Sequence, residues 1–151
     1  MTTRYHQGRF HPKNKDKYIG DVSNIIYRSS WERHFMFYLD FSSNVLKWNS
    51  EDVVINYYNP MDGKTHRYFI DFYVEYLDKD GKVQKTLIEI KPKSEMSPPK
   101  EPKRKTVKSV RNYNEAVRTY VKNRMKWEQA EKFARQNGLE FRVLNEDDLG
   151  I

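Results

Sequence analysis

The sequence predicts a single α/β domain in which a mixed central sheet is flanked by helices. Residues 67–76 and 86–91 are both strand-like and are separated by a turn, so they should pair as an antiparallel hairpin. A long helical pattern at residues 111–137 precedes a further strand-like segment at residues 139–144, and a crossover of this length can place that strand parallel in the same sheet. The length of 151 residues, with 37% hydrophobic content, suits one compact core.

The chain opens with a basic segment, residues 1–20, which we distinguish from the domain at residues 21–151. This N-terminal arm has five lysines and arginines against one acid, Asp16, and its aromatic residues follow neither a helical nor a strand period. We therefore expect it to lie over the domain as an extended segment.

The first helix should begin after Ser29, because Ser29 and Glu32 have the spacing of a capping box, and it should end near Asp40. Glu32 falls within the apolar arc of this helix, so its carboxylate should point inward. Two roles remain open for it, namely the capping partner of Ser29 or an acid that faces the hairpin. The arc consists of Trp31, Phe35, Met36, Tyr38 and Leu39.

Two short strands, residues 45–48 and 53–57, and a turn at residues 59–63 lead into the strand at residues 67–76. Asp71 is the lone charge at the centre of that strand. The turn at residues 78–81 contains Gly81, which can adopt a positive φ, and it closes the hairpin.

The second strand of the hairpin places Leu87, Glu89 and Lys91 on one face and Thr86, Ile88 and Ile90 on the other. An acid and a lysine on one face, with Asp71 across the hairpin, can hold a divalent cation and a phosphate. The alternative is that Asp71 lies at a strand edge and that Glu89 and Lys91 form a solvated ion pair.

Beyond Lys91 the chain becomes rich in proline and lysine, which predicts a mobile basic loop at residues 92–109. Residues 92–111 contain seven basic residues against two acids, in a chain with a formal net charge of +7. Such a segment suits the phosphate backbone of a nucleic acid, although a basic run can also serve solubility alone. The candidate nucleic-acid-binding residues are Lys93, Lys103, Arg104, Lys105, Lys108 and Arg111.

The helical pattern at residues 111–137 is compatible with one helix or two, and Gly138 has the position of a C′ residue. Residues 145–148, an asparagine followed by three acids, should open a last short turn. We expect the helix to bury a stripe formed by Tyr113, Ala116, Val117, Tyr120, Val121, Trp127, Ala130, Phe133 and Ala134.

Several classes of protein are excluded by composition. The chain has no cysteine, its four histidines lack the spacing of a zinc site, and no segment approaches the length of a membrane span. No glycine-rich nucleotide motif indicates an organic cofactor, and the N-terminus lacks the apolar run of a signal peptide. We therefore expect a cytoplasmic protein without a membrane or small-molecule partner.

The order of Glu32, Asp71 and residues 89–91 resembles the PD-(D/E)XK nuclease superfamily, and the spacing is similar to that of its transposase and phage junction-resolvase members. A narrower resemblance links residues 27–32, 68–72, 88–92 and 141–147 to the head completion nucleases of T-even-type tailed phages. One position departs from the superfamily pattern, because Ile70 stands where a proline usually precedes the first acid.

The resemblance implies a restriction-endonuclease-like core and a metal-dependent DNA endonuclease that acts in phage head completion and DNA packaging. It implies that Asp71, Glu89 and the Ile90 carbonyl hold Mg²⁺ or Mn²⁺. Lys91 would lie near the attacking water or the scissile phosphate, and Glu32 would orient water or a second ion. Phosphodiester hydrolysis needs a nucleophilic water and relief of phosphate charge, which a cation beside a lysine supplies.

The resemblance also implies that DNA is the substrate and that phage head or portal proteins are partners. The protein would act in the host cytoplasm during assembly, or in the virion. Two alternatives stay open. One is a non-catalytic virion protein that binds DNA ends or the portal through its two basic segments, residues 1–20 and 92–111. The other is a junction-resolving or repair nuclease, which should be a stable dimer that cuts branched DNA.

Overall fold

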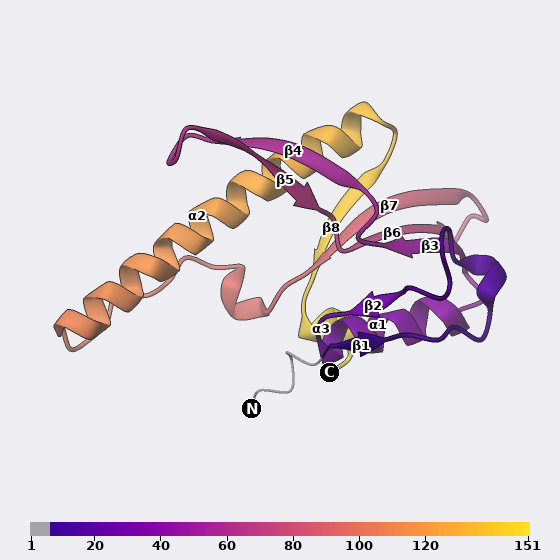
Figure 1. Cartoon of the computed structure of the whole chain (residues 1–151), viewed down its shortest axis with the longest axis horizontal. Helices are drawn as coiled ribbons and strands as arrows, with labels where there is room; N and C mark the ends of the chain where they lie inside the picture. Colours follow the sequence, from indigo (N-terminus) through magenta and orange to yellow (C-terminus); the bar gives the residue numbers. More distant parts are fainter. Residues whose placement is uncertain (1–6) are drawn as a thin grey trace.

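A four-stranded mixed sheet forms the centre of the molecule in the computed structural model, which describes residues 7–151 (Figure 1). Its strands lie in the order β3, β6, β7 and β8, with β3/β6 and β6/β7 antiparallel and β7/β8 parallel. The predicted class, a single mixed α/β domain with flanking helices, is confirmed. The strands are β3 (Val45–Ser50), β6 (Phe72–Leu77), β7 (Val83–Ile90) and β8 (Glu140–Leu144).

Two groups of elements cover the two faces of this sheet. One face packs against α1 (Ser30–Phe41), with the short strands β1 (Gly8–Arg9) and β2 (Ile26–Tyr27) and the helix α3 (Glu146–Leu149) close by. The other face packs against the second half of α2 (Val107–Gln136) and the hairpin of β4 (Val54–Asn59) and β5 (Lys64–Phe69). Two 3₁₀ turns, η1 (Lys15–Lys17) and η2 (Lys93–Glu95), complete the elements of the described chain.

The two hydrophobic cores follow from the alternation of side chains along β7. Ile88 joins the core beneath α1, whereas Leu87 joins the core beneath α2. Phe72 and Trp48 are completely or nearly completely buried in the first core. Trp127 and Ile70 are buried in the second. The predicted division of faces in this strand is therefore confirmed, and Glu89 faces α2 together with Leu87.

Residues 7–20 lie on the domain, in extended and turn conformations. The Phe10 ring is 3% exposed in the first core. The buried carboxylate of Asp40 accepts backbone N–H bonds from Lys13 (2.8 Å) and Asn14 (2.9 Å). These charge-assisted bonds fix the segment to the end of α1. The remainder of the predicted arm, residues 1–6, lies outside the described residues.

The predicted strand at residues 67–76 is wrong in one respect, because the chain breaks at Ile70 and Asp71 into β5 and β6. These two strands belong to different sheets. The Ile70 N–H donates to the Val53 carbonyl at 2.9 Å, and the Ile70 side chain packs in the second core. This hydrogen bond stabilises the break between β5 and β6. Proline, the usual residue at this position in the superfamily, has no N–H and could not form it.

The first helix begins and ends within one residue of the prediction. Ser29 is its N-cap, and the Ser29 hydroxyl accepts the Glu32 N–H at 3.1 Å. One member of the predicted apolar arc is wrong, because Tyr38 is 55% exposed. Asp40, which anchors residues 13 and 14, is buried on this helix instead.

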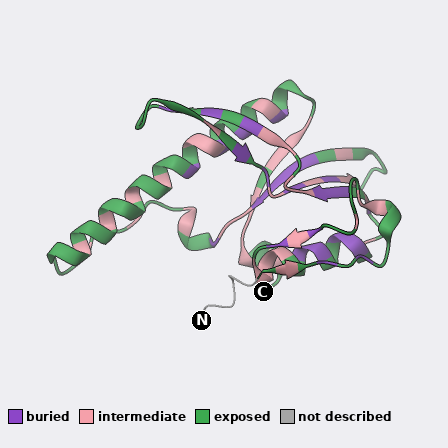
Figure 2. Ribbon diagram, viewed as in Figure 1, coloured by how far each residue is buried: buried purple, intermediate pink, exposed green. Residues whose placement is uncertain are grey.

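The helix α2 is a single helix of 30 residues, about 45 Å long, and it begins at Val107. Thr106 and Ser109 form its capping box, so residues 107–109 belong to the helix and not to the preceding loop. None of the buried α2 residues precedes Asn123. Residues 107–122, named here the α2 arm, extend beyond the sheet (Figures 1 and 2).

The N-terminal part of the predicted buried stripe is therefore wrong. Its apolar side chains are amphipathic in pattern, but the sheet ends before it reaches them, so no core forms there. In the part of the chain that the structure describes, no helix combines the length and the apolar character needed to cross a membrane. The stripe residues of this N-terminal part, none of which is buried, are Tyr113, Ala116, Val117, Tyr120 and Val121.

Candidate active site

The site lies where β6 begins and β7 ends. The ladder pairs Phe72 with Ile88, so the next position places Asp71 opposite Glu89. The Ile90 N–H donates to Asp71 Oδ2 at 2.9 Å, which brings Asp71 to the end of β7. Asp71 and Glu89 thus lie together, as the hairpin predicted.

The two carboxylates differ in their exposure to water, because Glu89 is buried and Asp71 is half-buried. Glu89 is 4% exposed, and its Oε1 atom has no hydrogen-bond partner. Burial and the Glu89 carboxylate raise the pKa of Asp71 well above its usual range, against the Ile90 N–H and the Lys91 ammonium. Burial also raises the pKa of Glu89. Two acids that face each other in such surroundings resist simultaneous ionisation, and a bound cation would relieve the repulsion between their ionised forms.

Lys91 follows at the end of β7 and is half-buried. Its backbone N–H donates to the Leu144 carbonyl at 2.9 Å, so the parallel pairing with β8 continues up to the site. The Lys91 ammonium attracts both Asp71 and Glu89. Asp71 immediately before β6, Glu89 within β7 and Lys91 immediately after β7 are therefore held at one end of two paired strands.

Glu32 approaches this group from the first turn of α1. Its Oε1 atom accepts the Arg28 N–H at 3.1 Å, whereas a standard capping box would bond the N–H of Ser29. Burial, followed by repulsion from Asp71, raises the pKa of Glu32 from 4.5 to about 7. The predicted capping box is therefore only half formed, because the Glu32 carboxylate accepts the Arg28 N–H in place of the Ser29 N–H, and the same carboxylate faces Asp71.

Glu51 is a further acid near the site that sequence reasoning missed. Its φ of 53° is the only positive φ among non-glycine residues of the described chain, and its N–H donates to the Asp71 carbonyl at 3.1 Å. Its carboxylate pairs with Arg28 Nε at 2.8 Å and contributes to the raised pKa of Glu32. No signal in the turn after β3 marks this residue in advance.

Lys126 of α2 was also missed. Its ammonium lies over the Tyr68 ring, 4.5 Å from the centroid, and it attracts Glu89. Burial lowers the pKa of Lys126. A sequence signal did exist, because Lys126 borders the apolar stripe beside Trp127 on the helix that the predicted crossover lays over Glu89.

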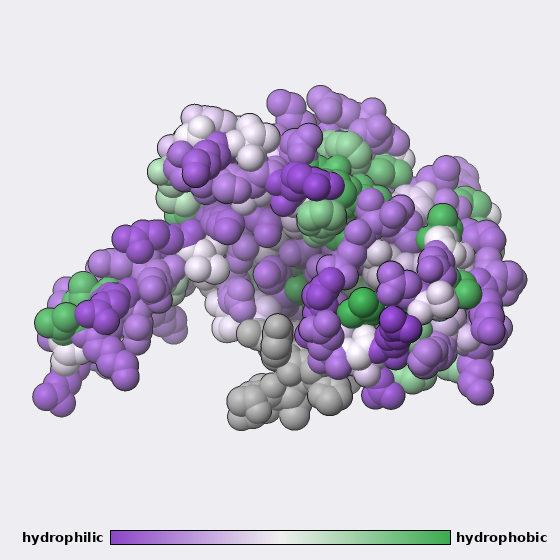
Figure 3. Space-filling view, viewed as in Figure 1, coloured by the Kyte–Doolittle hydropathy of each residue, from purple (hydrophilic) through white to green (hydrophobic). Residues whose placement is uncertain are grey.

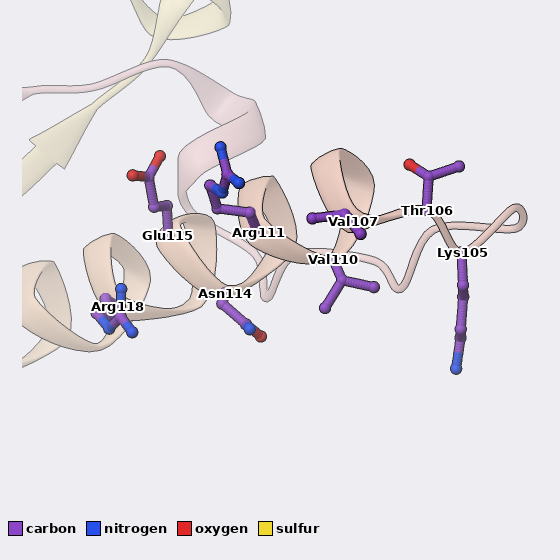
Figure 4. Close-up of a pocket in the computed structure, with 8 residues that line it drawn as sticks. All are labelled: Lys105, Thr106, Val107, Val110, Arg111, Asn114, Glu115 and Arg118. Carbon is purple, nitrogen blue, oxygen red and sulfur yellow. The ribbon is translucent and has the colours of Figure 1, made fainter.

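The predicted nucleic-acid-binding residues are separated from the acids. Lys103, Arg104 and Lys105 precede α2, and Lys108 and Arg111 lie in its first turns, at the far end of the α2 arm. Figure 4 shows Lys105 and Arg111 at this end of the helix. This arm has a mainly hydrophilic surface (Figure 3).

Lys93 differs from the other basic candidates, because it lies near the site and is already paired. Its ammonium contacts Asp147 at 2.8 Å, and its N–H donates to Glu146 at 2.7 Å. The segment that follows is not separate from the domain, since Ser94, Glu95, Ser97 and Pro99 line a crevice against α2. The five other basic candidates follow this segment and therefore lie at the N-terminal end of α2, away from the acids.

Asp71 and Glu89 supply two oxygen-ligand side chains, and Ile90 lies beside them in the chain. Within residues 7–151, no three His, Asp or Glu side chains are gathered into a complete metal site. The fit to a hard divalent cation rests on the unpartnered, buried Oε1 of Glu89 and on the oxygen character of the donors. Mg²⁺ needs only one or two carboxylates, because it keeps several of its waters.

Comparison with known proteins shows two similarities. Residues 42–146 match the family described as TnsA-like endonuclease N terminal, a segment that contains Asp71, Glu89, Lys91 and Lys126. The chain is also 39% identical over 144 residues to the head completion nuclease of Enterobacteria phage T4. That alignment covers 95% of this chain and 93% of the T4 protein, so it also includes most of the residues outside the family match.

Proposed function

The chain belongs to the TnsA-like endonuclease N-terminal family, and from this premise we propose that it is a Mg²⁺-dependent DNA endonuclease of the PD-(D/E)XK type that acts in phage head completion. The observation that carries the proposal is the pair of half-buried Asp71 and buried Glu89 beside Lys91, with one Glu89 oxygen left without a partner. Such a pair is costly to fold unless a ligand uses it.

Asp71, Glu89 and the Ile90 carbonyl would hold the cation, with water completing its shell. When bound there, Mg²⁺ supplies Lewis-acid polarisation of the phosphate and makes a nearby water more acidic. Mn²⁺ has similar oxygen preferences and should substitute for it. Asp71 is preorganised for this role because the Ile90 N–H fixes one of its two oxygens.

The remaining residues divide the work of hydrolysis. A water oxygen forms a bond to phosphorus while the bond from phosphorus to one sugar oxygen breaks, and the departing oxygen takes up a proton. Glu32, whose pKa is about 7, is suited to accept the proton that the water loses, because a base works best near the operating pH. Lys91 would contact a phosphate oxygen and stabilise its growing negative charge.

The α2 arm would bind the DNA backbone away from the point of cleavage. Its 16 residues span about 24 Å, comparable to about seven base-pair steps. Exposed lysines and arginines at its far end favour phosphate contacts, which position DNA without selecting sequence. We propose that the substrate is DNA, that head or portal proteins are partners, and that the protein acts during assembly in the host cytoplasm or in the virion.

A cleavage assay with linear, nicked and branched DNA in Mg²⁺ tests this function, with Asp71→Asn as the inactive control. We expect wild-type cleavage that EDTA stops and that Asp71→Asn lacks. Metal-independent DNA binding without any cleavage would instead support a structural DNA-end-binding protein. Strong preference for branched DNA by a stable dimer would support a junction-resolving nuclease.

A further inference from the structure

Lys126 brings a second cation to the acid pair from an element that the motif residues do not include. Glu32, Asp71, Glu89 and Lys91 come from α1 and from the hairpin of the sheet. Lys126 comes from the second half of α2, where that helix packs over the face of β7 that carries Glu89.

The position of Lys126 is fixed by the Tyr68 ring. The ammonium lies 4.5 Å from the ring centroid, and Tyr68 is 3% exposed. A cation over the face of a desolvated tyrosine is attracted by the ring, which favours one orientation of a long side chain. The neighbouring Trp127 is 6% exposed and anchors the same turn of α2 in the core.

Among the described residues, Lys126 forms no direct salt bridge that would explain its position. A lysine usually keeps its ammonium in water, whereas Lys126 is half-buried and lies among Glu89, Asp71 and Lys91. Beside it, Glu89 Oε1 is buried without a hydrogen-bond partner, and burial together with the nearby Glu89 carboxylate raises the pKa of Tyr68. A buried polar atom left unpartnered next to a placed cation marks space that a polar ligand would satisfy.

We propose that Lys126 is a second cationic residue of the active site, which acts with Lys91 to stabilise the negative charge that develops on the scissile phosphate. This inference rests on the proposed nuclease function. The charge count supports it, because two carboxylates and two ammonium groups sum to zero once Glu32 has accepted the proton of the attacking water and is neutral. A divalent cation then adds two positive charges, and a phosphodiester with an attacking hydroxide adds two negative ones. With Lys91 alone, one negative charge would be left uncompensated in a site shielded from water.

The test compares Lys126→Met with Lys126→Arg, and uses Lys132→Met as the matched control. Methionine keeps the length and apolar character of the stem, arginine keeps the charge, and Lys132 is an exposed lysine on the same helix. Two quantities are measured, namely kcat for DNA cleavage and the affinity of the DNA-free protein for Mn²⁺ by calorimetry.

We expect kcat to fall at least tenfold in Lys126→Met and to return to within about threefold of wild type in Lys126→Arg. We expect Mn²⁺ to bind Lys126→Met more tightly, by at least about threefold, because a like charge beside the carboxylates is removed. Lys132→Met should match wild type in both measurements.

Three results would overturn the inference. Wild-type kcat in a folded Lys126→Met protein would remove Lys126 from the chemistry. Weaker Mn²⁺ binding in that variant, with Lys126→Arg equally impaired, would make Lys126 a structural support of the metal site. A wild-type protein that binds Mn²⁺ but cleaves no DNA would overturn the proposed function and this inference together, whereas the first two results leave the proposed function standing.

Discussion

Replacing Glu32 by glutamine separates the charge of this side chain from its shape. The amide oxygen that Glu32→Gln introduces can still accept the Arg28 N–H, which lies 3.1 Å from Glu32 Oε1, so the start of α1 should be unaffected. The substitution removes the negative charge that faces Asp71, which the cap does not need. We expect kcat to fall at least tenfold, which corresponds to about 1.4 kcal/mol of transition-state stabilisation.

The same substitution should stabilise the metal-free protein, and by an amount that depends on pH. The pKa of Glu32 is about 7 in the folded state against a usual value of 4.5. Between these values the folded state keeps a proton that the unfolded state has lost, so the stability of the wild type falls as pH rises from 4.5 to 7. At about 1.4 kcal/mol per pKa unit, the loss is about 3 kcal/mol and is complete above a pH of about 7.

The assay is urea denaturation in EDTA at pH 4.5 and pH 8, paired with cleavage in saturating Mg²⁺. Glu32→Gln should exceed the wild type by about 3 kcal/mol at pH 8 and by little at pH 4.5. Glu128→Gln, an exposed position on α2, is the control and should show no pH-dependent gain. Equal stability of Glu32→Gln and wild type at both pH values would refute the burial argument, and unchanged turnover would leave Glu32 as a cap alone.

Three further predictions concern the acids, the α2 arm and the N-terminal segment. Asp71→Asn and Glu89→Gln should each abolish cleavage and Mn²⁺ binding. Each should also raise the melting temperature of the metal-free protein, because one of two mutually repelling acids is neutralised. Calorimetric Mn²⁺ binding as in the wild type would contradict this prediction. Changing Lys103, Arg104 and Lys105, just before the α2 arm, together to Ala should weaken DNA binding equally for all sequences and reduce the log-log salt slope by up to about one unit per contact. Wild-type affinity and slope would exclude this basic segment from the interface. Asp40→Ala should lower the free energy of unfolding by about 3 kcal/mol in urea titrations, since two backbone N–H groups lose a charged acceptor, and exposed Asp16→Ala should cost little.

The parts of the fold that depend on local chemistry could be predicted from sequence. Ser29 caps α1, Gly81 adopts a φ of 76° in the hairpin turn, and Gly138 adopts a φ of 69° after α2. The alternation along β7 placed Glu89 on the face opposite Ile88 because side-chain direction in a strand is fixed by its period. These predictions needed no knowledge of the partner elements.

The errors arose where the outcome depends on distant elements. The apolar stripe of the α2 arm has the same pattern as a buried helix, but the four-stranded sheet is too narrow to cover it. The continuous aromatic run at residues 67–76 gave no sign that β5 would leave the central sheet to pair with β4. Lys126 was missed for the related reason that its neighbours, Tyr68 and Glu89, are remote in sequence.

The break before β6 also decides how the first acid should be tested. The register of β6 and β7 places Ile70 opposite Ile90, but the chain turns away at Ile70 to donate its N–H to Val53. The Ile90 N–H therefore donates to the Asp71 carboxylate at 2.9 Å, where a continued strand would have offered a backbone carbonyl. An alanine at position 71 would leave this donor unpaired, at a cost of about 1–3 kcal/mol, and would mix a structural loss with the loss of a metal ligand. Asparagine keeps an oxygen for Ile90 and removes only the charge, so an inactive but stable Asp71→Asn protein would assign the defect to the chemistry of the site.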